Sequence, residues 1–169
     1  TVKSQAVQLN SDTINEFTIE ELINRIEFIK NNNQKMRRAI INYKVDIDCK
    51  TTIAGDISNL VQIIENLFIN AVQSYESMQN DNIVIDFHIL EDGNMVKYVI
   101  RDYGKGIPED IQDKLFRRMV TTKGKDGTGL SLLLSYSTIK GRFGGELWVE
   151  SKENAGTTFY ITIPIANKS

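Results

Sequence analysis

Apolar residues recur at intervals of three and four in several stretches of the chain, which predicts amphipathic helices there. Thr18 and Glu21 have the spacing of a capping box, and the helix that they open is expected to end at a run of asparagines. The longest helix is expected at about 57–77, with Asp56 or Ser58 as its N-cap. Its apolar positions form one face, which is the part of the helix that can be buried.

Two further helices are expected in the second half of the chain. One begins at Pro108, a residue suited to the first turn of a helix, and reaches about Met119. The other covers about 130–140 and ends near Gly141. Between them, residues 120–128 are rich in glycine and charge and have little to bury, so we expect a mobile loop there.

Alternating and β-branched stretches predict the strands of one sheet. One lies near residues 40–47, although its alternation is imperfect. The others form two hairpins, 83–90 with 95–102 and 146–151 with 157–164. Helices interleaved with paired strands predict an α+β fold, a two-layer α/β sandwich whose mixed, mostly antiparallel sheet is covered on one face by helices.

The composition limits the classes of function. With 169 residues, of which 41% are hydrophobic and 25% charged, the chain can bury one core. Its formal net charge of −2 excludes a generally basic nucleic-acid binder. The only cysteine, Cys49, and the only histidine, His88, exclude a disulfide framework and a multi-histidine metal centre. No apolar run approaches the roughly 20 residues of a membrane span.

The start of the chain is polar and weakly patterned. Residues 1–16 are expected to be a frayed lead-in from an upstream element. The chain begins at Thr1 with no signal-peptide pattern, so we interpret it as a piece of a longer protein.

Neutral amides form a stripe on the longest helix. Gln62, Asn66, Asn70 and Gln73 are spaced by four, four and three residues and therefore share one side. A solvated outer face is one explanation, but such faces are usually rich in lysine and glutamate. Amides also suit a site that contacts both a cation and phosphate oxygens, since an asparagine carbonyl is a ligand for Mg²⁺.

A carboxylate ends one predicted strand. Asp102 shares a strand face with Val96, Tyr98 and Ile100, so it continues a row that should face the core. A carboxylate there needs a hydrogen-bond donor, and the amino group of adenine is a suitable one, whereas guanine presents an oxygen. The glycines that follow would let the backbone approach a flat ligand. A glycine-rich turn with a capping aspartate is the alternative.

A second glycine-rich stretch, residues 123–131, runs directly into a predicted helix. Backbone N–H groups can converge in such a loop, and a helix N-terminus favours anions. The stretch is not a Walker A loop, because Leu130 follows Gly129 where lysine is required. A flexible linker with a glycine cap is the alternative.

In this order, and over about residues 17–165, these features resemble the ATP-binding domain of sensor histidine kinases. That domain belongs to the superfamily that also contains gyrase, the mismatch-repair ATPase and the heat-shock chaperone ATPase. The similar segments are the asparagine box Asn66–Ala71, the glycine boxes Asp102–Pro108 and Gly127–Leu130, the phenylalanine box Lys114–Phe116 with Thr121–Lys123, and the closing box Gly156–Phe159.

The resemblance implies a role for each matching residue. Asn70 would coordinate the Mg²⁺ that bridges the phosphates of ATP, assisted by Asn66, and Asp102 would bind the amino group of adenine. Gly104 and Gly106 would shape the base pocket, which Thr158 would support. Gly127, Thr128 and Gly129 would hold phosphate under a mobile ATP lid, with Lys123 near the γ-phosphate. Four further residues complete the implied ATP-binding set: Ile107, Phe116, Thr122 and Leu130.

The chain departs from the family pattern at three places. Gln73 stands where many members have lysine, as in nitrogen-regulation and sporulation-type kinases. Ser131 replaces the third glycine of the second glycine box, and Arg118-Met119 replaces Pro-Phe after the phenylalanine box. These departures bear on the lid and the phosphate contacts rather than on nucleotide binding itself.

The implied activity is transfer of the γ-phosphoryl group to a histidine outside this chain. Asn66 occupies the place where autonomous ATPases have a glutamate base, and an amide cannot accept the proton of a water. Glu65 lies about 100° away around the helix and is expected to face elsewhere. His88 sits in mid-strand and is expected to be a structural residue.

The resemblance to sensor histidine kinases also implies the partners of this domain. Residues 1–16 would lead in from an upstream dimerisation and phosphoacceptor domain of a two-component sensor kinase, and 17–169 would form a single catalytic domain. A response regulator acts downstream, and no nucleic acid or membrane contact is expected. The domain should work in the cytoplasm whether or not its parent is anchored in the cell membrane. The alternatives are a nucleotide-gated module that transfers nothing and a protein-serine kinase of the anti-sigma type.

Overall fold

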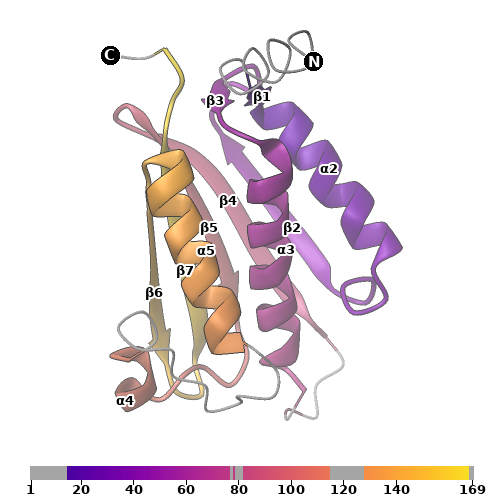
Figure 1. Cartoon of the computed structure of the whole chain (residues 1–169). Coiled ribbons are helices and arrows are strands. Elements are labelled where there is room, and N and C mark those ends of the chain that lie inside the picture. Colours follow the sequence, from indigo (N-terminus) through magenta and orange to yellow (C-terminus); the bar gives the residue numbers. More distant parts are fainter. Residues whose placement is uncertain (1–14, 77, 79–81, 115–127, 168–169) are drawn as a thin grey trace, which may run out of the picture.

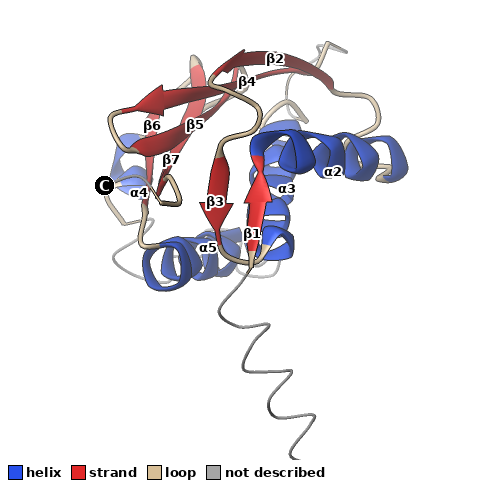
Figure 2. Cartoon of the chain, turned by 90° about the horizontal axis from the view of Figure 1, so that it is seen from above, coloured by secondary structure: helices blue, strands red, loops and turns tan. Residues whose placement is uncertain are grey.

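Helices and strands form two layers in the structure, a computed structural model that describes residues 15–76, 78, 82–114 and 128–167, without the side chains of 128–131. Five strands make one sheet, and the three long helices cover the same face of it (Figure 1). Figure 2 shows the two layers from above. The predicted α+β sandwich is therefore confirmed. Residues 120–127 of the predicted mobile loop lie outside the described residues, and Thr128, which we predicted to end that loop, is the first residue of a helix.

The elements, in chain order, are β1 Glu16–Thr18, α2 Ile19–Asn32, β2 Ile40–Asp46, β3 Thr52–Ala54, α3 Ile57–Gln73, β4 Val84–Asp92, β5 Met95–Asp102, α4 Glu109–Gln112, α5 Thr128–Phe143, β6 Glu146–Lys152 and β7 Gly156–Pro164. The large sheet has the order β2-β4-β5-β7-β6. β2 pairs with β4 in parallel and all other neighbours are antiparallel. The parallel pair arises because α3 crosses over the sheet between these two strands.

Most predicted boundaries are close to the observed ones. Thr18 and Glu21 form the predicted capping box, and Asp56 is the N-cap of α3. α3 ends at Gln73, earlier than predicted, because Ser74 caps it and its hydroxyl donates to the carbonyl of Ala71. None of the helices among the described residues is long and apolar enough to cross a membrane.

A second sheet of two short strands was not predicted. β1 pairs with β3 antiparallel, with Phe17 opposite Ile53, and both side chains are buried. Three-residue strands are too short to show alternation, so the sequence pattern gave no signal for them. Because Glu16 pairs with Ala54, the folded domain includes a residue that we had assigned to the lead-in.

The core lies between the large sheet and the helices. On β5 and β7 the inward-facing residues form paired rows, for example Tyr98 with Ile161 and Ile100 with Phe159, and all four are at most 4% exposed. Phe68 of α3 meets Phe87 of β4 edge to face, with ring centroids 5.5 Å apart. This packing fixes the end of β5 relative to α3, and both carry predicted site residues.

The other face of the sheet carries polar and aromatic side chains. Trp148 stacks on Tyr160 with ring centroids 5.2 Å apart, and the ammonium group of Lys97 lies over both rings. The imidazole of His88 lies 2.6 Å from the carboxylate of Asp46 on the neighbouring strand. His88 is thus part of a cross-strand pair on the sheet, as predicted for a structural residue.

Candidate functional site

Asp102 is a buried carboxyl at the end of β5, only 3% exposed. It continues the inward-facing row of β5, as the strand pattern predicted. Its Oδ1 accepts hydrogen bonds from the backbone N–H of Gly104 at 2.9 Å and from the hydroxyl of Ser74 at 3.0 Å. Thr157 lies opposite Asp102 on β7, and its backbone N–H lowers the pKa of the carboxyl from that side. Protein donors from three segments therefore hold this group in place.

Burial changes the acidity of this group. The loss of solvent raises the pKa of Asp102 above 3.8, and the hydrogen bonds from Gly104, Ser74 and Thr157 oppose that rise. The folded protein thus holds a carboxyl where its charged form is disfavoured. Such an arrangement is typical of functional sites, because a ligand donor can supply the missing stabilisation.

The glycines after Asp102 are required by the protein's own packing. A Cβ on Gly104 would lie 2.0 Å from the hydroxyl oxygen of Ser74. Gly106 has φ +72°, and a Cβ there would lie 2.1 Å from the carbonyl oxygen of Lys152. The loop is therefore pressed against both the end of α3 and the β6–β7 turn, which accounts for glycine at both positions without a ligand.

Hydrogen bonds fix the same loop from both sides. The backbone N–H of Lys105 donates to the carbonyl of Ser74 at 3.0 Å, and its carbonyl accepts from Asn154 at 2.6 Å. The N–H of Ile107 donates to the hydroxyl of Ser151 at 2.8 Å. Half-buried Ile107 also packs against the core. The geometry around Asp102 is thus preformed.

The amide stripe lies on α3, beside this loop. Gln62 is exposed, whereas Asn66, Asn70 and Gln73 are half-buried. The Nδ2 atom of Asn70 is buried and, among the described residues, has no hydrogen-bond partner. A buried donor without an acceptor costs about 1–3 kcal/mol, so this amide is set up for a partner that the described residues do not supply.

Ser74 links the two predicted parts of the site. Its backbone N–H donates to the carbonyl of Asn70 at 3.1 Å, and its hydroxyl donates to Asp102. The contacts of Ser74 therefore connect the turn of α3 that carries Asn70 directly with the buried carboxyl. Residues 115–127, which include several of the predicted phosphate-site residues, lie outside the described part of the chain.

The register of β7 separates two neighbouring threonines. Thr157 lies opposite Asp102 and is 4% exposed, so it belongs to the inward-facing row. Thr158 lies opposite Arg101 and therefore on the other face of the sheet. Thr157, which we had not singled out, is the threonine beside Asp102. Strand alternation from Phe159 could have identified it.

Several predicted residues cannot be placed. Phe116, Thr122, Lys123 and Gly127 lie outside the described residues. The backbone of Thr128, Gly129 and Leu130 forms the start of α5, and their side chains are not described. We did not single out Ser74 from the sequence. This residue lies just beyond the last turn of α3, so the helical spacing of polar residues does not point to it.

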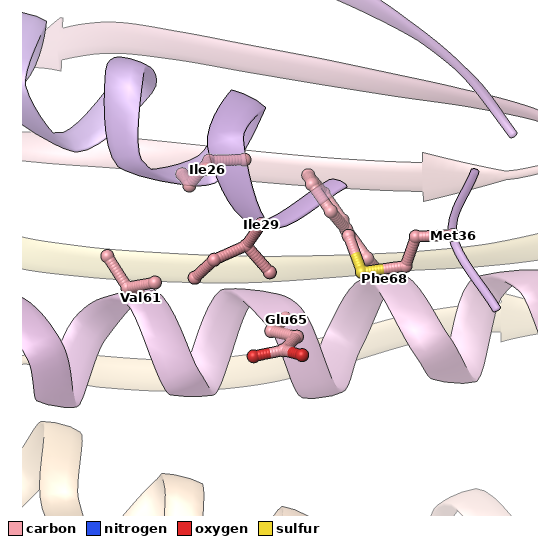
Figure 3. Close-up of a pocket in the computed structure, with 6 residues that line it drawn as sticks. All are labelled: Ile26, Ile29, Met36, Val61, Glu65 and Phe68. Atoms are coloured by element: carbon pink, nitrogen blue, oxygen red, sulfur yellow. The ribbon is translucent and has the colours of Figure 1, made fainter. Parts of the chain in front are cut away.

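Glu65 faces away from the amide stripe, as predicted. Its Oε1 accepts a hydrogen bond of 2.9 Å from the side-chain amide of Asn33, beyond the end of α2. It also borders a small apolar cavity between α2 and α3 (Figure 3), lined otherwise by Ile26, Ile29, Met36, Val61 and Phe68. This cavity has no room for a water molecule and holds none of the predicted site residues. Glu65 is therefore engaged elsewhere.

Comparisons with known proteins agree with this geometry. Residues 55–167 match the family described as histidine kinase-, DNA gyrase B-, and HSP90-like ATPase. A probable C4-dicarboxylate sensor kinase of Halalkalibacterium halodurans is 37% identical over 63% of this chain and 20% of its own length. Sporulation kinase A of Bacillus subtilis is 37% identical over 66% and 18%. The chain thus spans about a fifth of the curated relatives that it matches.

A solved structure extends the match to most of the chain. The nucleotide-free catalytic domain of histidine kinase ThkA has a TM-score of 0.68 and 27% identity, over 89% of this chain and 94% of that one. The two-layer fold of this chain agrees with that of this catalytic domain. The chain belongs to the family of histidine kinase-, DNA gyrase B-, and HSP90-like ATPases, with the fold of a histidine kinase catalytic domain.

Proposed function

We propose that this domain binds Mg-ATP and transfers the γ-phosphoryl group to a histidine on a separate dimerisation domain of its parent protein. One observation carries the proposal: the buried amide of Asn70, which has no partner among the described residues, lies one turn of α3 from Ser74, which holds the buried carboxyl of Asp102. A buried carboxyl whose charged form is disfavoured, together with an amide donor that has no acceptor among the described residues, suits a ligand with an amine at one end and anionic oxygens at the other.

The base would bind at Asp102. The exocyclic amine of adenine donates to the carboxylate and restores the stabilisation that burial removes. Guanine carries an oxygen at the corresponding position and would face the carboxylate with a second acceptor. Gly104 and Gly106 keep the loop close to α3 and to β6–β7, and Thr157 holds the carboxyl from the neighbouring strand.

The phosphates and the metal ion would lie at the amide stripe. Asn70 offers a carbonyl oxygen as a Mg²⁺ ligand and an N–H donor for a phosphate oxygen, with Asn66 one turn earlier. The described residues hold no cluster of three or more acidic, histidine or cysteine side chains for a metal. When bound, Mg²⁺ offsets the charge on the transferring phosphoryl group.

The reaction would be transfer rather than hydrolysis. Asn66 cannot take a proton from water, and Glu65 is bonded to Asn33 on the far side of the helix. His88 is paired with Asp46 in the sheet, so the acceptor histidine would come from another domain. Lys123, Thr122, Phe116 and the segment Gly127–Leu130 would complete the phosphate site as a lid.

The partners that we propose are a dimerisation domain of the parent and a response regulator. ThkA, whose catalytic domain shares this fold, has been solved in complex with the response regulator TrrA. The setting proposed for the domain is the cytoplasm, with a two-component sensor kinase as the parent.

The test is labelling of the acceptor. Radiolabelled Mg-ATP and this domain are mixed with the histidine-bearing dimerisation domain of the parent, and acid-labile phosphate on that domain is measured. We expect label on the histidine, and none on this chain alone. ATP binding without any label would support the nucleotide-gated module instead. Label on serine of an added protein substrate would support the kinase of the anti-sigma type.

A further inference from the structure

We propose that Ser74 is a positioning residue for base recognition: its hydroxyl holds the carboxylate of Asp102 in the orientation that accepts the purine amine, and ties that carboxylate to the helix turn of Asn70. This inference rests on the proposed function, since it assigns a role within the same nucleotide site.

Every polar atom of Ser74 is engaged at this junction. Its backbone N–H donates to the carbonyls of Asn70 and Ala71, at 3.1 and 3.2 Å, and its carbonyl accepts from Lys105 at 3.0 Å. Its hydroxyl oxygen lies 2.7 Å from the carbonyl of Ala71 and 3.0 Å from Oδ1 of Asp102. One residue thus joins the metal-side turn of α3, the glycine loop and the buried carboxyl.

The hydroxyl has one proton and two acceptors. A carboxylate is the stronger acceptor when it is ionised, whereas the carbonyl of Ala71 competes once Asp102 is protonated. The contact between Ser74 and Asp102 therefore favours the charged form of the carboxyl, against the effect of burial. The charged form is the one that accepts an amine.

The contact between Ser74 and Asp102 also limits which lone-pair positions of the carboxylate remain open to a ligand. An ionised carboxylate has about four lone-pair positions. Two are filled at Oδ1, by the hydroxyl of Ser74 and the N–H of Gly104, and Thr157 lies opposite on β7. These contacts restrict the direction from which a ligand amine can approach, so the loss of the Ser74 donor should loosen recognition of the amine rather than binding of the phosphates.

Among the described residues, few other titratable groups face this carboxyl. From α3 and its end, Tyr75 interacts with Asp102, and its hydroxyl is held between the N–H of Tyr103 and the carbonyl of Val84. Burial raises the pKa of Tyr75, so it stays neutral in the acid range. On β4 the inward-facing Ile85 lies opposite Asp102, and Asp86 lies in the outward-facing row. An acid limb that appears for ATP and not for purine riboside triphosphate, which has the same phosphates, would therefore report Asp102.

The experiment compares two ligands and two serines. The dissociation constants of Mg-ATP and of the Mg complex of purine riboside triphosphate, which lacks only the amine, are measured by calorimetry between pH 5 and 8. Ser74→Ala should weaken ATP binding about tenfold, the loss of one hydrogen bond to a charged group, and purine riboside triphosphate less than twofold. Its acid limb should move to higher pH. Ser58→Ala, at the other end of α3, should leave both ligands and the limb unchanged.

Equal weakening of both ligands, no weakening, or an unmoved acid limb would overturn the role of Ser74. If Ser74→Ala does not fold, Ser74→Cys keeps the size of the side chain with a weaker donor and should show the same selective loss, smaller in extent. Asp102→Asn separates this inference from the proposed function. If that variant still prefers ATP over purine riboside triphosphate, base recognition by Asp102 fails. If Asp102→Asn loses the preference for ATP but the Ser74 variants keep it, the role of Ser74 fails and the proposed function stands.

Discussion

The two ends of the site differ in how far the protein completes them. At Asp102, donors from the end of α3, the glycine loop and β7 surround the carboxyl before any ligand arrives. At Asn70, one turn earlier on α3, the buried Nδ2 has no acceptor among the described residues. The base end is preformed and the phosphate end is left for the ligand to complete.

This difference has a physical reason. A flat purine with a fixed amine is recognised by a rigid acceptor, so orienting it in advance lowers the entropy lost on binding. A metal ion bound to flexible phosphates already carries phosphate oxygens as ligands. An amide that the protein has not fixed by a hydrogen bond can adjust to these oxygens better than a rigid group can. Both ends disfavour the ligand-free fold, one through a buried carboxyl and the other through an unpaired donor.

The largest expected effect comes from the incomplete end. Asn70→Ala should reduce phosphoryl transfer by about a hundredfold or more, because it removes the proposed metal ligand and phosphate donor. The free energy of unfolding without ligand should stay the same or increase, since a buried donor that has no partner among the described residues is lost. The measurements are transfer rate and urea denaturation. Gln62→Ala, two turns earlier on the same stripe and exposed, is the control and should change neither.

Asp102→Asn tests the preformed end. We expect ATP affinity to fall about thirtyfold or more. The asparagine amide is neutral, and its NH₂ group is a donor that cannot accept a hydrogen bond from the adenine amine. Without nucleotide the variant should be more stable than the unsubstituted protein at pH 7, by about 1 kcal/mol or a few degrees in Tm.

The pH dependence of that stability has a definite sign. Because the pKa of Asp102 is raised, the folded state binds its proton more tightly than the unfolded state does. The contribution of Asp102 to stability is therefore present below its ordinary pKa of 3.8 and is lost as the pH rises through the raised value. The stability advantage of Asp102→Asn should grow from pH 4 to pH 7. An advantage that shrinks over this range would contradict the buried, costly carboxyl.

A glycine pair tests the packing between the two ends. Gly104→Ala should destabilise the fold by about 2–3 kcal/mol, because its Cβ would lie 2.0 Å from the hydroxyl oxygen of Ser74. Gly141→Ala, within α5 and with open space around it, should stabilise the fold by about 0.5–1 kcal/mol. Denaturant unfolding of both variants measures this. Similar stabilities of the two variants would show that the loop is not pressed against α3.

The smallest effect is expected at the histidine. His88→Gln removes a pair with Asp46 whose side chains are 31% and 53% exposed, so the free energy of unfolding should change by less than about 1 kcal/mol. Label transfer to the external dimerisation domain should stay within twofold. Loss of transfer in this variant, with the fold intact, would instead point to His88 as an acceptor.

The sequence predicted the long helices and strands of this domain well, and its short strands and helix ends less well. The apolar face of α3 and the inward row of β5 each repeat over several turns or pairs, so periodicity located them. The strands β1 and β3 are three residues long and carry no such repeat. The end of α3 was placed too late because the cap at Ser74 depends on a carbonyl and a carboxyl that meet only in the folded chain.

The candidate site divides in the same way. Asp102, Asn66 and Asn70 could be named from strand and helix spacing together with residue chemistry. Ser74 could not, since nothing in its neighbourhood along the chain indicates that a carboxyl 28 residues later will contact it. Gly104 was expected to admit a ligand, and the structure adds that Ser74 already occupies the space beside it.

One titration tests the central claim, that Asn70 and Asp102 serve a single nucleotide. The side-chain amide of Asn70 and the backbone amide of Gly104 are followed by nuclear magnetic resonance while a non-hydrolysable ATP analogue with Mg²⁺ is added to the full chain. Both signals should shift along one binding curve with the same Kd, and without Mg²⁺ the Asn70 signal should shift much less than that of Gly104. Two curves with different Kd values, or no shift at Asn70 at saturation, would contradict the claim.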